Sequence, residues 1–131
     1  MAYLGISRRA ARDIEELRRF SVEHWGERVA EEYIDSIEQA LNRLRENPSL
    51  LRAKPEFSRH FRFHRVKRHF LVCSFVENNV YVLAVKHGSL DLPSRLAELE
   101  PNLQQEVDLL HRAFLAKMSH PRRGSQGLQD T

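Results

Sequence analysis

The side chains best suited to chemistry are one histidine, His87, and two arginines that precede it in the sequence. His87 follows an apolar run at 80–85, and an imidazole gives or takes a proton near neutral pH. Metal-free RNA cleavage needs a group that activates the 2′-hydroxyl, a group that protonates the leaving oxygen, and cations for the developing charge. Arg62 and Arg65 could supply the cations. The sequence offers no clear second acid or base beside His87, so the catalytic set is incomplete.

Other chemistries are less well supported by the sequence. The seven histidines show no zinc-site spacing. His60 and His64 lie four apart, and on a strand that separation is about 13 Å, too far for one ion. Cys73 lies in a strongly apolar segment, which predicts a buried packing residue. Because it is the single cysteine, an intramolecular disulfide is excluded. No Gly-rich phosphate loop is present. We therefore expect neither a metal nor a cofactor.

Charge is unevenly distributed along the 131 residues, whose formal net charge is +3. Residues 13–46 carry ten acids and five bases, a net charge of −5, whereas residues 52–68 carry seven bases and one acid, a net charge of +6. A basic block beside an acidic block can steer a polyanion or an acidic protein partner. The alternative is an ordinary solvated surface.

Hydrophobic periodicity predicts a short strand followed by two helices. Residues 2–6 form an apolar run, and Ser7 is a plausible N-cap for a helix with apolar positions three or four residues apart that ends at Gly26. A second amphipathic helix is expected from about residue 27 to residue 46, where Asn47-Pro48 ends it. The short connection predicts an antiparallel helical hairpin.

From residue 60 the apolar period changes to that of strands. Residues 61–64 alternate, residues 69–76 are almost continuously apolar, and residues 80–85 form another apolar run after a turn at Glu77-Asn78-Asn79. We expect a three-stranded antiparallel meander joined by the N-terminal strand. The order β-α-α-β-β-β predicts an α+β domain with the helices on one face of the sheet.

The remaining chain divides into an extension and a tail. We place the domain at 1–96, a helical extension interrupted near Pro101 at 97–118, and a disordered tail at 119–131. The extension carries an apolar stripe that we expect to cover part of the domain surface. There is neither an apolar run long enough to span a membrane nor an export signal, so we expect a cytoplasmic protein.

Several segments, taken in this order, resemble the RelE/ParE superfamily of toxins from bacterial type II toxin–antitoxin operons. The resemblance covers roughly residues 3–96 and is closest to the ParE branch at its last segment. The segments that carry it are Ser7 to Ile14, Trp25 to Ala30, Arg43 to Pro48, Lys67 to Phe70 and Val85 to Pro93.

The resemblance implies one of two activities. ParE-type toxins poison DNA gyrase, and RelE-type toxins cleave messenger RNA in the ribosome; a cognate antitoxin neutralises both and forms an oligomer with the toxin. The ribonuclease branch tends to carry Arg-Leu-Val-Tyr in the central strand, where this chain has Phe70 and Cys73 in place of the Arg and the Tyr. We therefore expect a gyrase inhibitor that acts by binding. The alternatives are a RelE-type endoribonuclease using His87, Arg62 and Arg65, or a non-toxic homologue that only binds antitoxin.

Five residues are candidates for partner binding, because arginines anchor interfaces well and loops at sheet ends carry function. They could equally be structural, with the arginines paired to the acidic helix and His87 holding the turn at Gly88. Trp25 is expected to cover the corner between the helices as a core residue. The candidates are Arg62, Arg65, Arg68, His87 and Asp91.

Overall fold

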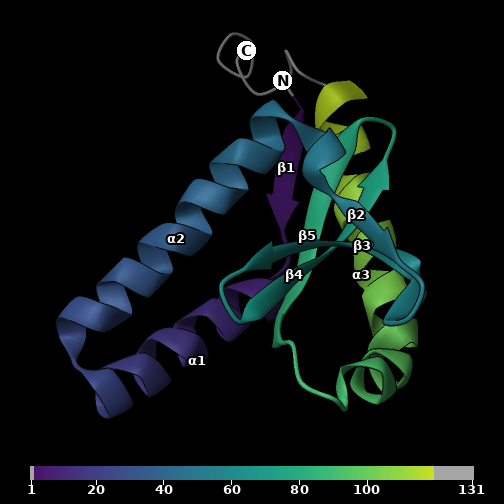
Figure 1. The fold of residues 1–131 in the computed structure, drawn as a ribbon. Helices are drawn as coiled ribbons and strands as arrows, with labels where there is room; N and C mark the ends of the chain where they lie inside the picture. Colours follow the sequence, from purple (N-terminus) through teal and green to yellow (C-terminus); the bar gives the residue numbers. More distant parts are fainter. Residues whose placement is uncertain (1, 120–131) are drawn as a thin grey trace, which may run out of the picture.

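The computed structural model describes residues 2–119 as one five-stranded sheet between a helical hairpin and a long C-terminal helix (Figure 1). The strand order is β1-β5-β4-β3-β2, with β1 parallel to β5 and the other neighbours antiparallel. This confirms the α+β class, the hairpin and the meander. The elements are β1 (Tyr3–Ile6), α1 (Arg8–Trp25), α2 (Glu27–Glu46), the 3₁₀ turn η1 (Pro48–Leu50), β2 (Arg52–Lys54), β3 (Ser58–Val66), β4 (His69–Val76), β5 (Asn79–His87) and α3 (Leu92–Ser119).

The hairpin begins and turns where its capping residues predict. The Ser7 hydroxyl accepts a hydrogen bond from the Ala10 amide at 3.0 Å, which satisfies one free donor of the first helical turn. Gly26 ends α1 at φ +90, a conformation that side chains rarely adopt, and its amide donates to the Val22 carbonyl. Its carbonyl then accepts the Ala30 amide, so one residue ends α1 and opens α2.

The start of α1 also completes the open edge of β5. Strand β1 pairs with β5 only as far as Ile6 and Val82. Beyond that point the Ser7 hydroxyl donates to the Leu83 carbonyl at 3.1 Å, and the Asp13 carboxylate accepts the Val85 amide at 2.9 Å. Side chains of α1 therefore replace the missing strand, because buried backbone groups need partners. This contact fixes α1 against β5.

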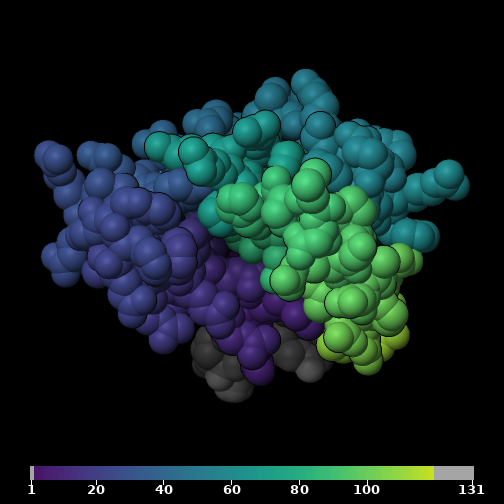
Figure 2. Space-filling view, turned by 60° about the horizontal axis from the view of Figure 1, so that its bottom comes forward, coloured from purple at the N-terminus to yellow at the C-terminus, as the bar shows by residue number. Residues whose placement is uncertain are grey.

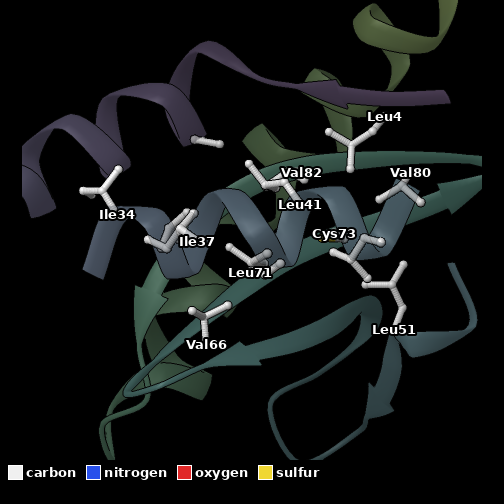
Figure 3. Packing of buried hydrophobic residues seen from close by; sticks show 14 residues of the cluster. Leu4, Ile34, Ile37, Leu41, Leu51, Val66, Leu71, Cys73, Val80 and Val82 are labelled. Carbon is white, nitrogen blue, oxygen red and sulfur yellow. The ribbon is translucent and has the colours of Figure 1, made fainter. Parts of the chain in front are cut away.

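The first core lies between the hairpin and one face of the sheet. Ile34, Ile37 and Leu41 of α2 belong to one buried cluster with Leu71 and Cys73 of the central strand β4 (Figure 3). Cys73 is fully buried, and burial raises the pKa of its thiol far above the usual range. It is a packing residue, as its apolar neighbours in sequence predicted.

The second core lies on the opposite face of the sheet, where α3 packs. Side chains from α3 join Phe63 and Tyr81 and are themselves almost wholly buried. The two hairpin helices cover one face of the sheet, as expected, and α3 covers the other. Figure 2 shows α3 and the hairpin on either side of the N-terminal segment. The buried α3 side chains are Leu92, Leu96, Leu103 and Val107.

Helix α3 also runs unbroken through Pro101, where the sequence predicted an interruption. A proline inside a helix costs about 3 kcal/mol, whereas each fully buried leucine contributes roughly 1.5–3 kcal/mol. Four buried side chains on both sides of Pro101 outweigh the lost hydrogen bond. The apolar stripe fades toward the end of α3, where Met118 is 58% exposed. The predicted tail lies almost entirely outside the described residues.

Candidate functional site

A cleft of about 520 Å³ opens between α1, α2 and the neighbouring ends of β4 and β5. Its chemistry-bearing side chains come from three directions: Asp13 from α1, Tyr33 from α2, and His69 and His87 from the sheet. Arg68, in the turn before β4, and Lys86 also line it. Two of the predicted partner-binding residues, Arg68 and His87, therefore meet in one hollow.

His69 and His87 are cross-strand partners in the β4–β5 ladder. Their ring centroids lie 5.2 Å apart with the ring planes at 90°. The expectation that no second acid or base lies beside His87 is therefore wrong. The reason is a bulge between Val72 and Cys73, which shifts the register by one residue. Without that shift, the pairing that begins at Val76 and Asn79 would put Lys86 opposite His69.

Hydrogen bonds fix the orientation of the His69 ring. The Arg68 amide donates to the Tyr33 hydroxyl oxygen at 3.1 Å, and that hydroxyl lies 2.7 Å from His69 Nδ1. Because burial and the neighbouring His87 lower the pKa of His69 to about 4, the ring is neutral at pH 7. Tyr33 therefore holds the neutral ring of His69 in orientation through Nδ1.

On the α1 wall, Asp13 is engaged with the sheet. Its carboxylate accepts the Val85 amide and lies 3.7 Å from Lys86 Nζ. Burial raises the pKa of Asp13, although the Val85 amide and the Lys86 ammonium oppose that shift. Asp13 therefore helps to build the wall, and its charge is largely offset by Lys86.

The outer rim of the cleft is aromatic. Phe20 and Trp25 line it and are 48% and 57% exposed. The expectation that Trp25 is a core residue is wrong, because α1 and α2 diverge from the sheet and their connection at Gly26 lies away from both cores (Figure 1).

Arg62 and Arg65 lie away from this cleft and on opposite faces of the sheet. Alternate residues of a strand face opposite sides, so Arg62 shares the face of Val66, which packs in the hairpin core. Arg65 shares the other face, where its guanidinium lies 5.8 Å from the Phe70 ring centroid and its Nε donates to the Lys67 carbonyl. The structure does not bring the proposed ribonuclease set of Arg62, Arg65 and His87 together.

Asp91 organises the loop that follows β5. It accepts hydrogen bonds from the Ser89 hydroxyl and from Arg95 Nε, which lower the pKa of its carboxyl. A smaller hollow of about 290 Å³ beside His87 is lined by these residues. Asp91 and His87 therefore line the same hollow.

Sequence reasoning missed His69, Tyr33 and Lys86 as site residues. The register of β4 and β5 depends on a bulge that no residue pattern announces, and Tyr33 belongs to the apolar stripe of α2. Within residues 2–119, no three metal-ligating side chains gather at one point. No helix in the same range is both long and apolar enough to span a membrane.

A strand, a helical hairpin and an antiparallel meander with an open cleft beside the last strand define a class of small α+β proteins. The family model described as "ParE toxin of type II toxin-antitoxin system, parDE" matches residues 4–92, which is more than half of the chain. The chain therefore belongs to the ParE toxin family. Helix α3 begins where that match ends.

A solved structure titled "Chromosomal ParDE TA system from P. aeruginosa" shares the fold at a TM-score of 0.60 and 15% sequence identity. The similarity covers 68% of this chain and 98% of the other chain, so about a third of this chain has no counterpart there. No curated protein matches the sequence.

Proposed function

We propose that this toxin inhibits DNA gyrase by binding to it in the cytoplasm, and that a cognate antitoxin neutralises it in an oligomeric complex. Membership of the ParE family supports the toxin class. The observation that carries the binding mechanism is the state of His69, whose Nδ1 is occupied by Tyr33 and whose pKa of about 4 makes it a poor base at neutral pH. The cleft combines this weak base with the Arg68 guanidinium and an aromatic rim, which are suited to binding.

The decisive experiment measures supercoiling by purified gyrase with increasing amounts of the purified toxin. We expect inhibition together with accumulation of cleaved DNA, because gyrase supplies the bond-breaking chemistry. Addition of the cognate antitoxin should restore supercoiling. Unaffected supercoiling would contradict the proposal.

The second candidate is a RelE-type endoribonuclease, and the proximity of His69 to His87 is the observation that favours it. In that case His87 and His69, with Arg68 as the cation, would replace the set proposed from the sequence. Rapid messenger cleavage on ribosomes alongside intact supercoiling would establish this alternative. Expression without antitoxin separates both from a non-toxic homologue, which would leave growth unchanged.

A further inference from the structure

The free end of the helical hairpin carries exposed apolar side chains. Phe20, Trp25 and Val29 are 48%, 57% and 40% exposed. They lie near the turn at Gly26, which projects away from the sheet (Figure 1). We call Phe20, His24, Trp25 and Val29 the aromatic tip. A group of exposed apolar side chains of this kind marks a surface that a partner covers.

The aromatic tip is held in one arrangement by its own contacts. The Phe20 and His24 rings stack with centroids 3.9 Å apart, and the Trp25 ring lies 5.6 Å from Phe20 at 75°. The Phe20 carbonyl lies 2.8 Å from His24 Nδ1, which fixes the imidazole. A rigid aromatic group loses little conformational entropy on binding, which is typical of residues that dominate interface energy.

The inner end of the cleft supplies a complementary polar corner. Its donors are the guanidinium of Arg68 and the ring of His87, and the ring of His69 lies beside them. On the facing wall, Glu16 also lines the cleft, and the Asp13 carboxylate is already engaged by Lys86 and the Val85 amide. A carboxylate from a partner would therefore meet donors at this corner. The cleft thus suits a segment with an apolar side chain for the rim and a carboxylate for the corner.

The chain covers both faces of its sheet by itself. The hairpin buries one face, and α3 buries Phe61, Phe63 and Val72 on the other. A partner therefore cannot use the centre of either sheet face without displacing a helix. The cleft and its aromatic rim remain open, and they combine the residue types, Trp, Tyr and Arg, that are enriched in binding hot spots.

We propose that the aromatic tip and the Arg68–His87 corner form the surface that binds gyrase. The bound gyrase segment carries an apolar side chain, which contacts the aromatic tip, next to a carboxylate, which contacts the corner. This inference rests on the proposed function and assigns it to a particular surface. The target binds across the hairpin end of the cleft, while the α3 side of the molecule takes no part in that contact.

The test compares Trp25→Ala and Arg68→Ala with two matched controls in the full-length toxin. Leu109→Ala removes an apolar side chain of α3 that is as exposed as Trp25, at 57%. Arg59→Ala removes an exposed cation of the same basic block that lies outside the cleft. Each variant is checked for its fold by circular dichroism and thermal unfolding before it is assayed with gyrase.

We expect Trp25→Ala and Arg68→Ala to raise the toxin concentration for half-maximal inhibition of supercoiling at least about tenfold, as for hot-spot residues. The controls should change it less than about twofold. Equal inhibition by Trp25→Ala and the wild type would overturn this inference and leave the proposed function standing. A wild-type toxin that neither binds nor inhibits gyrase would overturn the proposed function itself. Loss of inhibition in the control variants to the same degree would also contradict the assignment of this surface.

Discussion

The rings of His69 and His87 meet edge to face across two neighbouring strands, with centroids 5.2 Å apart. Both side chains lie at the end of the sheet beside α1 and α2, where Tyr33 holds His69 through Nδ1. A proton on His69 would bring positive charge close to His87 and Arg68. Burial and His87 accordingly lower the pKa of His69 to about 4.

This relationship predicts a loss of stability in mild acid. The unfolded chain binds a proton at His69 near the ordinary pKa of 6.5, whereas the folded chain does so only near 4. The free energy of unfolding should therefore be highest above pH 6.5 and decline as the pH falls toward 4. The shift corresponds to at most ~3 kcal/mol, and partial exposure of the ring reduces the expected loss to ~1–2 kcal/mol.

Urea unfolding at several pH values checks this prediction, with His69→Gln as the test and His24→Gln as the control. The pKa of His64 is also lowered by burial, so part of the decline should persist in His69→Gln. The raised pKa of Asp13 acts in the opposite sense, because a carboxyl protonated more readily in the folded state favours folding as pH falls. A wild-type curve that stays flat between pH 6.5 and 5 would contradict the assignment.

Helix α3 should be an integral part of the folded chain. Leu103 is fully buried against the sheet, and Leu109 on the same helix is 57% exposed. We expect Leu103→Ala to lower the free energy of unfolding by about 2–5 kcal/mol and Leu109→Ala by less than ~0.5 kcal/mol. Chemical denaturation of the two variants measures both values, and similar values would show that α3 does not pack as described.

Truncation before α3 extends this test. Removal of residues 92–131 exposes the second core, including Phe61, Phe63 and Tyr81. We expect aggregation or loss of the cooperative unfolding transition, which size-exclusion chromatography and thermal scans would report. A monomeric truncated chain with wild-type stability would contradict a covering role for α3. Antitoxin affinity measured on the full chain and on any soluble truncation then shows whether α3 and the antitoxin compete.

The side chain of Ser7 should contribute more to the free energy of unfolding than its small size suggests. Its hydroxyl caps α1 and also donates to the Leu83 carbonyl on the edge of β5. Ser7→Ala should therefore cost about 1–3 kcal/mol, since a cap and a buried acceptor both lose a partner. Ser36→Ala is the control, because that exposed hydroxyl bonds only to the Glu32 carbonyl of its own helix. Equal stability of the two variants would count against the double role of Ser7.

Two glycines should resist substitution for different reasons. A Cβ at Gly88 would lie 2.7 Å from Phe70 Cε2, so Gly88→Ala must push the ring into the second core. Gly26 has open space around it but lies at φ +90, so Gly26→Ala strains only the backbone. We expect losses of about 1–3 kcal/mol at Gly88 and about 1–2 kcal/mol at Gly26. A crystal structure of Gly88→Ala would show the displaced Phe70 ring, and an unmoved ring would contradict the steric reason.

The sequence predicted where most helices and strands begin and end better than it predicted how they pack and pair with one another. Ser7, Gly26 and Asn47-Pro48 mark the ends of the helices through local backbone chemistry, and the structure confirms these ends. Strand β2 was missed because its three residues carry no apolar alternation and depend on pairing with β3. Periodicity also showed that α3 has an apolar face, yet it gives no information about which side of a sheet that face covers.

The candidate site was predicted in part for the same reason. Arg68 lies just before the start of β4, and His87 and Asp91 lie at and just after the end of β5. Because β4 and β5 are antiparallel neighbours, the strand order alone places these three residues at the same end of the sheet. The pairing of His87 with His69 depends on one bulged residue, which is set by tertiary contacts. Trp25 was assigned to the core by its size, although its surroundings depend on how far the hairpin extends beyond the sheet.

The pairing of β1 with β5 also constrains how the protein emerges from the ribosome. The first strand is synthesised at the start, but its partner is complete only at His87, after every other strand has left the exit tunnel. Until then Tyr3 to Ile6 have no neighbour in the sheet, and the amide of Ser7 lacks its Val82 acceptor. A growing or prematurely ended chain therefore cannot assemble the cleft until almost the whole domain has been translated.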